Sequence, residues 1–117
     1  MTVTTVFAVV PTADLATARS WWTRLLGREP DRVPMPSDVE WVLVPPGGGI
    51  QVVEDAEHAG AGTVTLAVDD VDAALRDAAA RGLEVPEAGT VPSGQFRIAM
   101  LCDPDGNTVV VSQPLPG

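Results

Sequence analysis

The sequence has one cysteine, one histidine and no lysine. The single cysteine, Cys102, excludes an internal disulfide and a zinc site built from several thiolates. All the basic residues are arginine, 7 of them against 16 Asp and Glu, so the formal net charge at pH 7 is -9. Because such an acidic chain repels polyanions, we expect no nucleic acid and no anionic membrane as a partner, and we favour a neutral or cationic small molecule.

Long apolar runs are also missing, since no stretch approaches the roughly 20 residues that cross a bilayer. Met1–Thr5 carries no basic residue, so we expect no signal peptide and a cytoplasmic location. The length of 117 residues suits one core, and we predict a single domain over residues 1–117.

The two halves of the chain repeat one pattern. The apolar, β-branched run Val6–Val10 is followed by Asp14, a suitable N-cap, and by a helical spacing of apolar residues. The same order recurs with Val64–Val68 and Asp70. The two aspartates are 56 residues apart (70 − 14 = 56), close to half the chain, which indicates two copies of one module rather than a solenoid.

Each copy continues with three strand-like segments. In the first copy these are the Pro-rich stretch 30–36, which is a loop or an edge strand, and the strands Glu40–Val44 and Ile50–Glu54. In the second copy they are Leu83–Val85, Phe96–Leu101 and Thr108–Ser112. Pro45–Gly49 is expected to be a tight connection, and Pro86–Gly94 a loop. The pattern predicts an α+β fold of two βαβββ modules, about 1–57 and about 60–117.

Three motifs carry a resemblance to a known family. They are Ala18–Gly27 (ARSWWTRLLG), Val68–Ala73 (VDDVDA) and Asp103–Asn107 (DPDGN), and they span nearly the whole chain in this order. The chain resembles the vicinal oxygen chelate superfamily, which includes glyoxalase I, bleomycin-resistance proteins, extradiol dioxygenases and methylmalonyl-CoA epimerase. The resemblance implies mixed sheets that curl around a cleft, and at this length a homodimer.

The enzymes of this family hold a divalent metal with His and Glu side chains from the first and last strands of each module. The matching positions here are Thr5, Gln51, Thr63 and Val110. Hydroxyl, amide and apolar groups make a poor ligand set for such an ion. We therefore expect no metal, no cofactor and no catalytic residue, as in the bleomycin-resistance-like members that bind a drug without changing it.

The sequence thus predicts that a small organic molecule is bound by an apolar pocket with a few polar groups. The predicted ligand-binding residues are Phe7, Trp41, Gln51, Thr63, Thr65, Arg97 and Val110. Two of them have an alternative, because Trp41 also suits the core and Arg97 also suits a surface salt bridge.

Two other functions stay open at this point. The chain could be a lyase, an isomerase or a dioxygenase whose metal ligands lie at other positions, or a non-catalytic partner module. His58 is either a ligand or base acting with Glu54, or a solvated loop residue.

Overall fold

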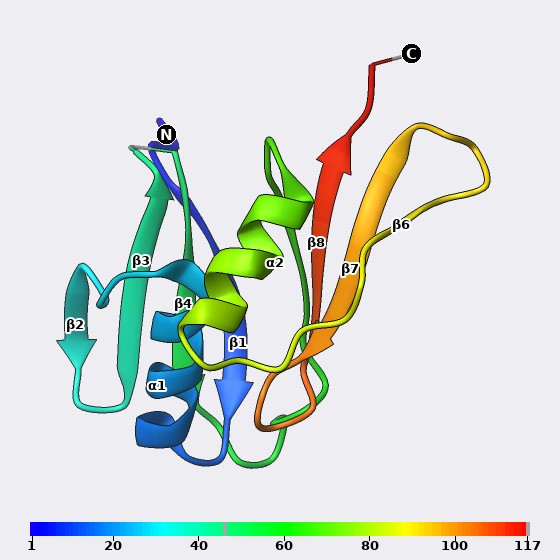
Figure 1. Ribbon diagram of the computed structural model, residues 1–117. Coiled ribbons are helices and arrows are strands. Elements are labelled where there is room, and N and C mark those ends of the chain that lie inside the picture. The colour runs from blue at the N-terminus through cyan, green and yellow to red at the C-terminus, as the bar shows by residue number, and fades with distance from the viewer. Residues whose placement is uncertain (46, 117) are drawn as a thin grey trace.

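Two four-stranded sheets lie side by side, and both helices pack on the same side of them (Figure 1). The structure is a computed structural model, and it describes residues 1–45 and 47–116. The first module consists of β1 (Val6–Thr12), α1 (Leu15–Leu26), β2 (Arg32–Met35), β3 (Asp38–Val44) and β4 (Gly48–Glu54). The second consists of β5 (Thr63–Ala67), α2 (Val71–Ala80), β6 (Gly89–Thr90), β7 (Phe96–Cys102) and β8 (Thr108–Pro114).

The two sheets have the same topology. The strand order is β1-β4-β3-β2 in one and β5-β8-β7-β6 in the other. The first and last strands of each module pair in parallel, and the remaining neighbours are antiparallel. The edges of the sheets meet where β1 contacts β5. The predicted α+β fold of two βαβββ modules is confirmed.

Local capping signals position both helices as the sequence predicts. The Asp14 carboxylate accepts a hydrogen bond from the Thr17 backbone N–H at 3.2 Å, and this bond lowers the pKa of Asp14. Asp70 accepts the Ala73 N–H at 3.0 Å in the same way. Gly27 ends α1 in the left-handed region, with a φ of 78°.

Two details of the predicted strands are wrong. Leu83–Val85 forms no strand, because Leu83 is buried and hydrogen-bonds to the end of α2 through Ala78. The second strand of that module is instead the short β6, within the predicted loop, where Gly89 pairs with Ile98. In the predicted connection Pro45–Gly49, the two last glycines belong to β4, and Pro46 lies outside the described residues.

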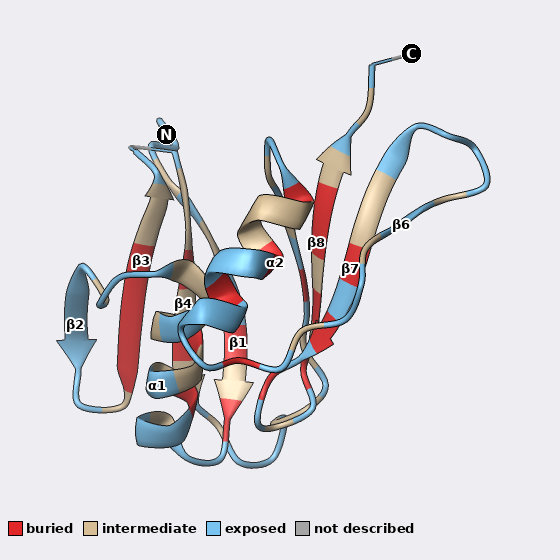
Figure 2. Ribbon diagram, viewed as in Figure 1, coloured by how far each residue is buried: buried red, intermediate tan, exposed pale blue. Residues whose placement is uncertain are grey.

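The core lies between the helices and the sheets. Trp22 of α1 and Trp41 of β3 are its largest fully buried side chains, packed with aliphatic residues of β1 and β4. In Figure 2 the buried residues lie along the strands beneath the helices, whereas β2 is exposed. Within the described part of the chain, no helix is both long and apolar enough to span a membrane.

The turn between β7 and β8 fastens the second module to the first. Asn107 is 1% exposed, and its amide oxygen accepts the backbone N–H groups of Gly60 and Gly62 at 3.1 and 2.8 Å. Its amide nitrogen donates to the Pro11 carbonyl at 2.8 Å. One side chain therefore binds β1 and the connection between the modules at the same time.

Asp103 and Asp105 complete this linkage. Asp103 is 4% exposed, and its carboxylate accepts the Trp22 indole N–H at 3.3 Å and the Asn107 amide at 2.9 Å. Asp105 accepts the Thr12 hydroxyl and the Ala13 backbone N–H. Because burial of an unpaired polar group is costly, this complete set of partners holds the turn in one position. We call Asp103, Asp105 and Asn107 the inter-module turn.

Replacing Asn107 with Ala is expected to lower the free energy of unfolding by about 3 kcal/mol, because it removes a buried side chain and leaves the Gly60 and Gly62 N–H groups and the Pro11 carbonyl without this partner. Urea denaturation followed by tryptophan fluorescence measures the change. Gln95→Ala is the control, since Gln95 is exposed and its loss should cost no more than about 0.5 kcal/mol. A loss in Asn107→Ala as small as in the control would contradict the role of the turn.

Candidate functional site

Each sheet has one face that no helix covers, which we call its open face. Side chains alternate between the two faces of a strand, so residues that pair across strands share a face. On the first sheet, pairing places Val9 beside Gln51, Gln51 beside Glu40, and Glu40 beside Arg32. These four residues form one row across β1, β4, β3 and β2.

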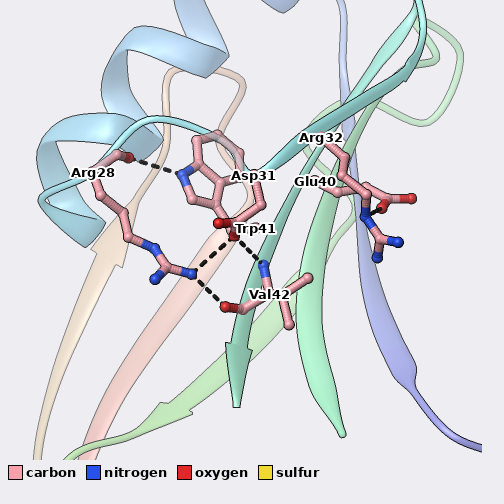
Figure 3. Close-up of polar contacts among 6 residues, drawn as sticks. All are labelled: Arg28, Asp31, Arg32, Glu40, Trp41 and Val42. Carbon is pink, nitrogen blue, oxygen red and sulfur yellow. Dashed lines mark hydrogen bonds and ion pairs between the residues drawn. The ribbon is translucent and has the colours of Figure 1, made fainter. Parts of the chain in front are cut away.

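A buried carboxylate lies in the middle of this row. The Glu40 side chain is 8% exposed. One carboxylate oxygen accepts the Gln51 amide N–H at 2.5 Å, and the other lies 3.0 Å from Nε of Arg32. Figure 3 shows the Arg32 and Glu40 side chains together, across β3 from the Trp41 ring. Arg32 itself is 57% exposed, so the ion pair has one buried and one solvated partner.

Phe7 lies beside this ion pair. The centre of the Arg32 guanidinium is 5.7 Å from the centroid of the Phe7 ring, within cation–π range. Phe7 pairs with Gly49, and a Cβ at Gly49 would come within 2.8 Å of the ring and 2.2 Å of the Trp41 carbonyl oxygen. Only glycine therefore leaves room for the ring over β4. The open face of the first sheet thus combines an aromatic ring, an amide and a carboxylate.

The open face of the second sheet is uncharged. Thr65, Val110 and Met100 form its central row, because Thr65 pairs with Val110 and Val110 with Met100. Thr63 lies on the same face, next to Thr108. Thr63, Thr65 and Met100 are exposed, so a ligand on this face would meet hydroxyl and apolar groups.

Five of the seven predicted ligand-binding residues therefore lie on the open faces. They are Phe7, Gln51, Thr63, Thr65 and Val110. The structure divides them between the two sheets, with Phe7 and Gln51 on the first and the other three on the second.

Trp41 and Arg97 point toward the helices instead. Trp41 is 0% exposed, its ring belongs to the core, and its indole N–H donates to the Arg28 carbonyl at 2.9 Å. Arg28 and Asp31 in turn bind the Val42 backbone (Figure 3). The core alternative for Trp41 is the one that the structure supports.

Arg97 binds a helix residue rather than reaching an open face. Its guanidinium forms two hydrogen bonds to the Asp72 carboxylate of α2, at 2.8 and 2.9 Å. These bonds lower the pKa of Asp72 and raise that of Arg97. We therefore do not carry Trp41 or Arg97 into the proposed site.

The residues at the family's metal positions do not suit a divalent ion. Thr5 precedes β1, and the β1 residue beside Gln51 is Val9; on β5 the residue beside Val110 is Thr65. The four predicted positions contain no imidazole or carboxylate. The same is true of the four that strand pairing gives, which are Val9, Gln51, Thr65 and Val110. Over residues 1–45 and 47–116, no three His, Cys, Asp or Glu side chains are grouped so that they could share one ion. His58 is exposed and its ring lies 2.8 Å from Asp55 in the same loop.

A hollow lies on the helix side, between the two sheets. It has a volume of about 530 Å³ and an apolar lining that includes Leu26, Leu43, Ile50 and Leu66. No titratable side chain is among its lining residues, so it offers space for an apolar group but little to orient one.

Sequence reasoning missed Glu40 and Arg32. Glu40 lies in a predicted strand between two apolar residues, and this alternation signals a side chain on the opposite face. Its contact with Gln51 depends on the register of β3 against β4, which has an irregularity between Val42 and Val44. The alternation could have identified Glu40, but its partners could not be identified without the pairing.

Comparisons with known proteins agree with this fold. A family model of the Glyoxalase/Bleomycin resistance protein/Dioxygenase superfamily matches residues 4–111. The crystal structure of a glyoxalase/bleomycin resistance protein from Catenulispora acidiphila DSM 44928 is 34% identical in sequence, with a TM-score of 0.87, and the match covers 97% of this chain and 99% of that one.

Two more distant structures share the fold. A bleomycin-binding protein complexed with bleomycin is 16% identical, with a TM-score of 0.77 and coverage of 94% of this chain and 98% of that one. TnmS3, an antibiotic binding protein from Streptomyces sp. CB03234, is 23% identical, with a TM-score of 0.73 and coverage of 93% of each chain. No curated protein sequence matches the chain. The family match and the 34% identical structure together establish that this chain belongs to the glyoxalase/bleomycin resistance protein/dioxygenase superfamily.

Proposed function

We propose that this protein binds a small organic molecule on its open faces without a metal, and that it sequesters a drug or metabolite rather than transforming it. The observation that carries the proposal is the chemistry of those faces. The positions where the family's enzymes carry metal ligands hold hydroxyl, amide and apolar groups, and Phe7 and Glu40 share the open face of the first sheet with Gln51. Such a surface can bury and hydrogen-bond a guest, but it lacks the ligands that position a Lewis acid.

The two distant structures also support a function in binding a small molecule. One protein of this fold was crystallised with bleomycin and another is described as an antibiotic binding protein. Proteins of this fold can therefore bind a drug or an antibiotic. The acidic composition of this chain suits a neutral or cationic guest.

A second copy of the chain is part of the proposal, because one copy leaves the open faces exposed. Val9 on the first sheet is 55% exposed, and Met100 on the second is 59% exposed. A pocket that holds a small molecule normally covers most of its surface. We infer a homodimer in which the open faces of two copies cover one another and enclose the guest.

A panel of aromatic and cationic compounds, including glycopeptide drugs, tests the binding function. A matched ligand at one hundred times its Kd should stabilise the fold by about 2.7 kcal/mol, which raises the Tm by several degrees in a thermal shift assay. Elemental analysis of protein purified without chelator should find no stoichiometric divalent metal, and EDTA should leave the ligand-induced shift unchanged.

Two outcomes would contradict this function. A stoichiometric Zn, Ni, Mn or Fe that is required for binding would favour a metal-dependent lyase, isomerase or dioxygenase. A panel in which no compound raises the Tm would favour a non-catalytic partner module.

The homodimer predicts that light scattering gives twice the chain mass of 12.2 kDa. Val9→Asp should shift the protein toward the monomer, because it puts a charge into the covered face. Val44→Asp is the matched control: Val44 is 67% exposed, but it lines the helix-side hollow rather than an open face. A monomeric wild type, or dissociation by Val44→Asp alone, would overturn this arrangement.

A further inference from the structure

We propose that Arg32 is a built-in occupant of a cation-binding site formed by Glu40, Gln51 and Phe7, and that the guest taken there is an organic cation with a flat, delocalised charge, such as a guanidinium or amidinium. The inference rests on the proposed function and specifies the chemical class of the guest.

The buried carboxylate of Glu40 favours a cationic guest. Its side chain is 8% exposed, so its carboxylate needs charged or hydrogen-bonding partners. Gln51 donates to one oxygen and leaves the other to Arg32. A molecule that displaces Arg32 must supply donors to that second oxygen, and a cation does so with the least loss of electrostatic energy.

The Phe7 ring determines the shape of the guest. A guanidinium or amidinium is planar, so it can donate two N–H groups in its plane while its face lies against an aromatic ring. Arg32 has both kinds of contact, with Glu40 at 3.0 Å and the Phe7 centroid at 5.7 Å. Because Gly49 has no Cβ, the Phe7 ring can lie over β4, where its face contacts the Arg32 guanidinium.

Arg32 is the partner that can move. It belongs to β2, an edge strand of four residues whose side chains are all exposed. This strand pairs with β3 at only two positions and with an irregular register. By contrast, Glu40, Gln51 and Phe7 lie on longer strands, two of them in the middle of the sheet. Release of Arg32 therefore breaks few contacts outside the ion pair.

A tethered guanidinium competes with any free cation for the same carboxylate. If Arg32 occupies the site about nine-tenths of the time, the apparent Kd of a free cation is raised about tenfold. Removal of Arg32 should reverse that effect, which a purely structural ion pair would not do.

The test compares benzamidine, a flat aromatic cation, with its neutral analogue benzamide in isothermal titration calorimetry of the full chain. Arg32→Ala should bind benzamidine about tenfold more tightly than the wild type, with no gain for benzamide. The double variant Arg32→Ala with Glu40→Gln should lose the gain. Arg97→Ala is the matched control, because it breaks an Arg–carboxylate pair on the helix side and should leave benzamidine binding at the wild-type level.

If Arg32→Ala destabilises the fold, the rise in Tm caused by benzamidine still tests the inference. The variant leaves one oxygen of Glu40 unpaired, so benzamidine should raise its Tm more than it raises that of Arg97→Ala. Unchanged or weaker benzamidine binding in Arg32→Ala, or an equal gain in Arg97→Ala, would overturn the inference. If compounds of the panel still raise the Tm of the wild type when the inference fails, the proposed binding function stands without the cation site. A gain in Arg32→Ala when no panel compound binds would support the cation site and overturn the sequestration function.

Discussion

The buried hydrogen bonds of the inter-module turn are the constraint on which the rest of the molecule depends. Each module is a thin layer, one helix on one sheet, and the edges of the two sheets meet where β1 contacts β5. Asn107, Asp103 and Asp105 connect β1, α1 and the loop between the modules, with donors and acceptors paired. Because Asn107 and Asp103 are buried, each alternative placement of the modules would leave several of their polar atoms without partners.

This connection has a consequence for the open faces. It fixes both helices on the same side of the sheets, so the opposite faces are left uncovered together (Figure 1). Val9 and Met100, which a second layer would normally bury, are more than half exposed. The missing second layer leaves a broad surface on which the proposed guest and the proposed second copy would bind, and the buried turn holds that surface in one shape.

Local signals in the sequence predicted the modules, while the site depended on pairing between distant strands. Asp14 and Asp70 marked the helix starts because an N-cap acts within three residues. The face that Trp41 occupies depends instead on the register of β3, where a shift by one residue reverses every side chain. The same holds for Arg97, which the alternation of β7 directs toward Asp72. Phe7 and Gln51 were predicted from strand alternation and the family resemblance, but their neighbours Glu40 and Arg32 come from strands whose register the sequence does not reveal.

The surroundings of the Arg32–Glu40 pair show which kind of cation the open face of the first sheet can hold. A carboxylate this deeply buried needs charged or hydrogen-bonding partners, and at Glu40 one of them is the positive charge of Arg32. A divalent ion would need further anionic or imidazole ligands nearby, and Gln51 and Val9, which lie in the same row as Glu40, supply none. A guanidinium needs no such ligands, because its charge is spread over a plane that an aromatic ring and a single carboxylate can accommodate. The side chains around Glu40 therefore suit an organic cation better than a metal, and Arg32 is the organic cation that the chain itself provides.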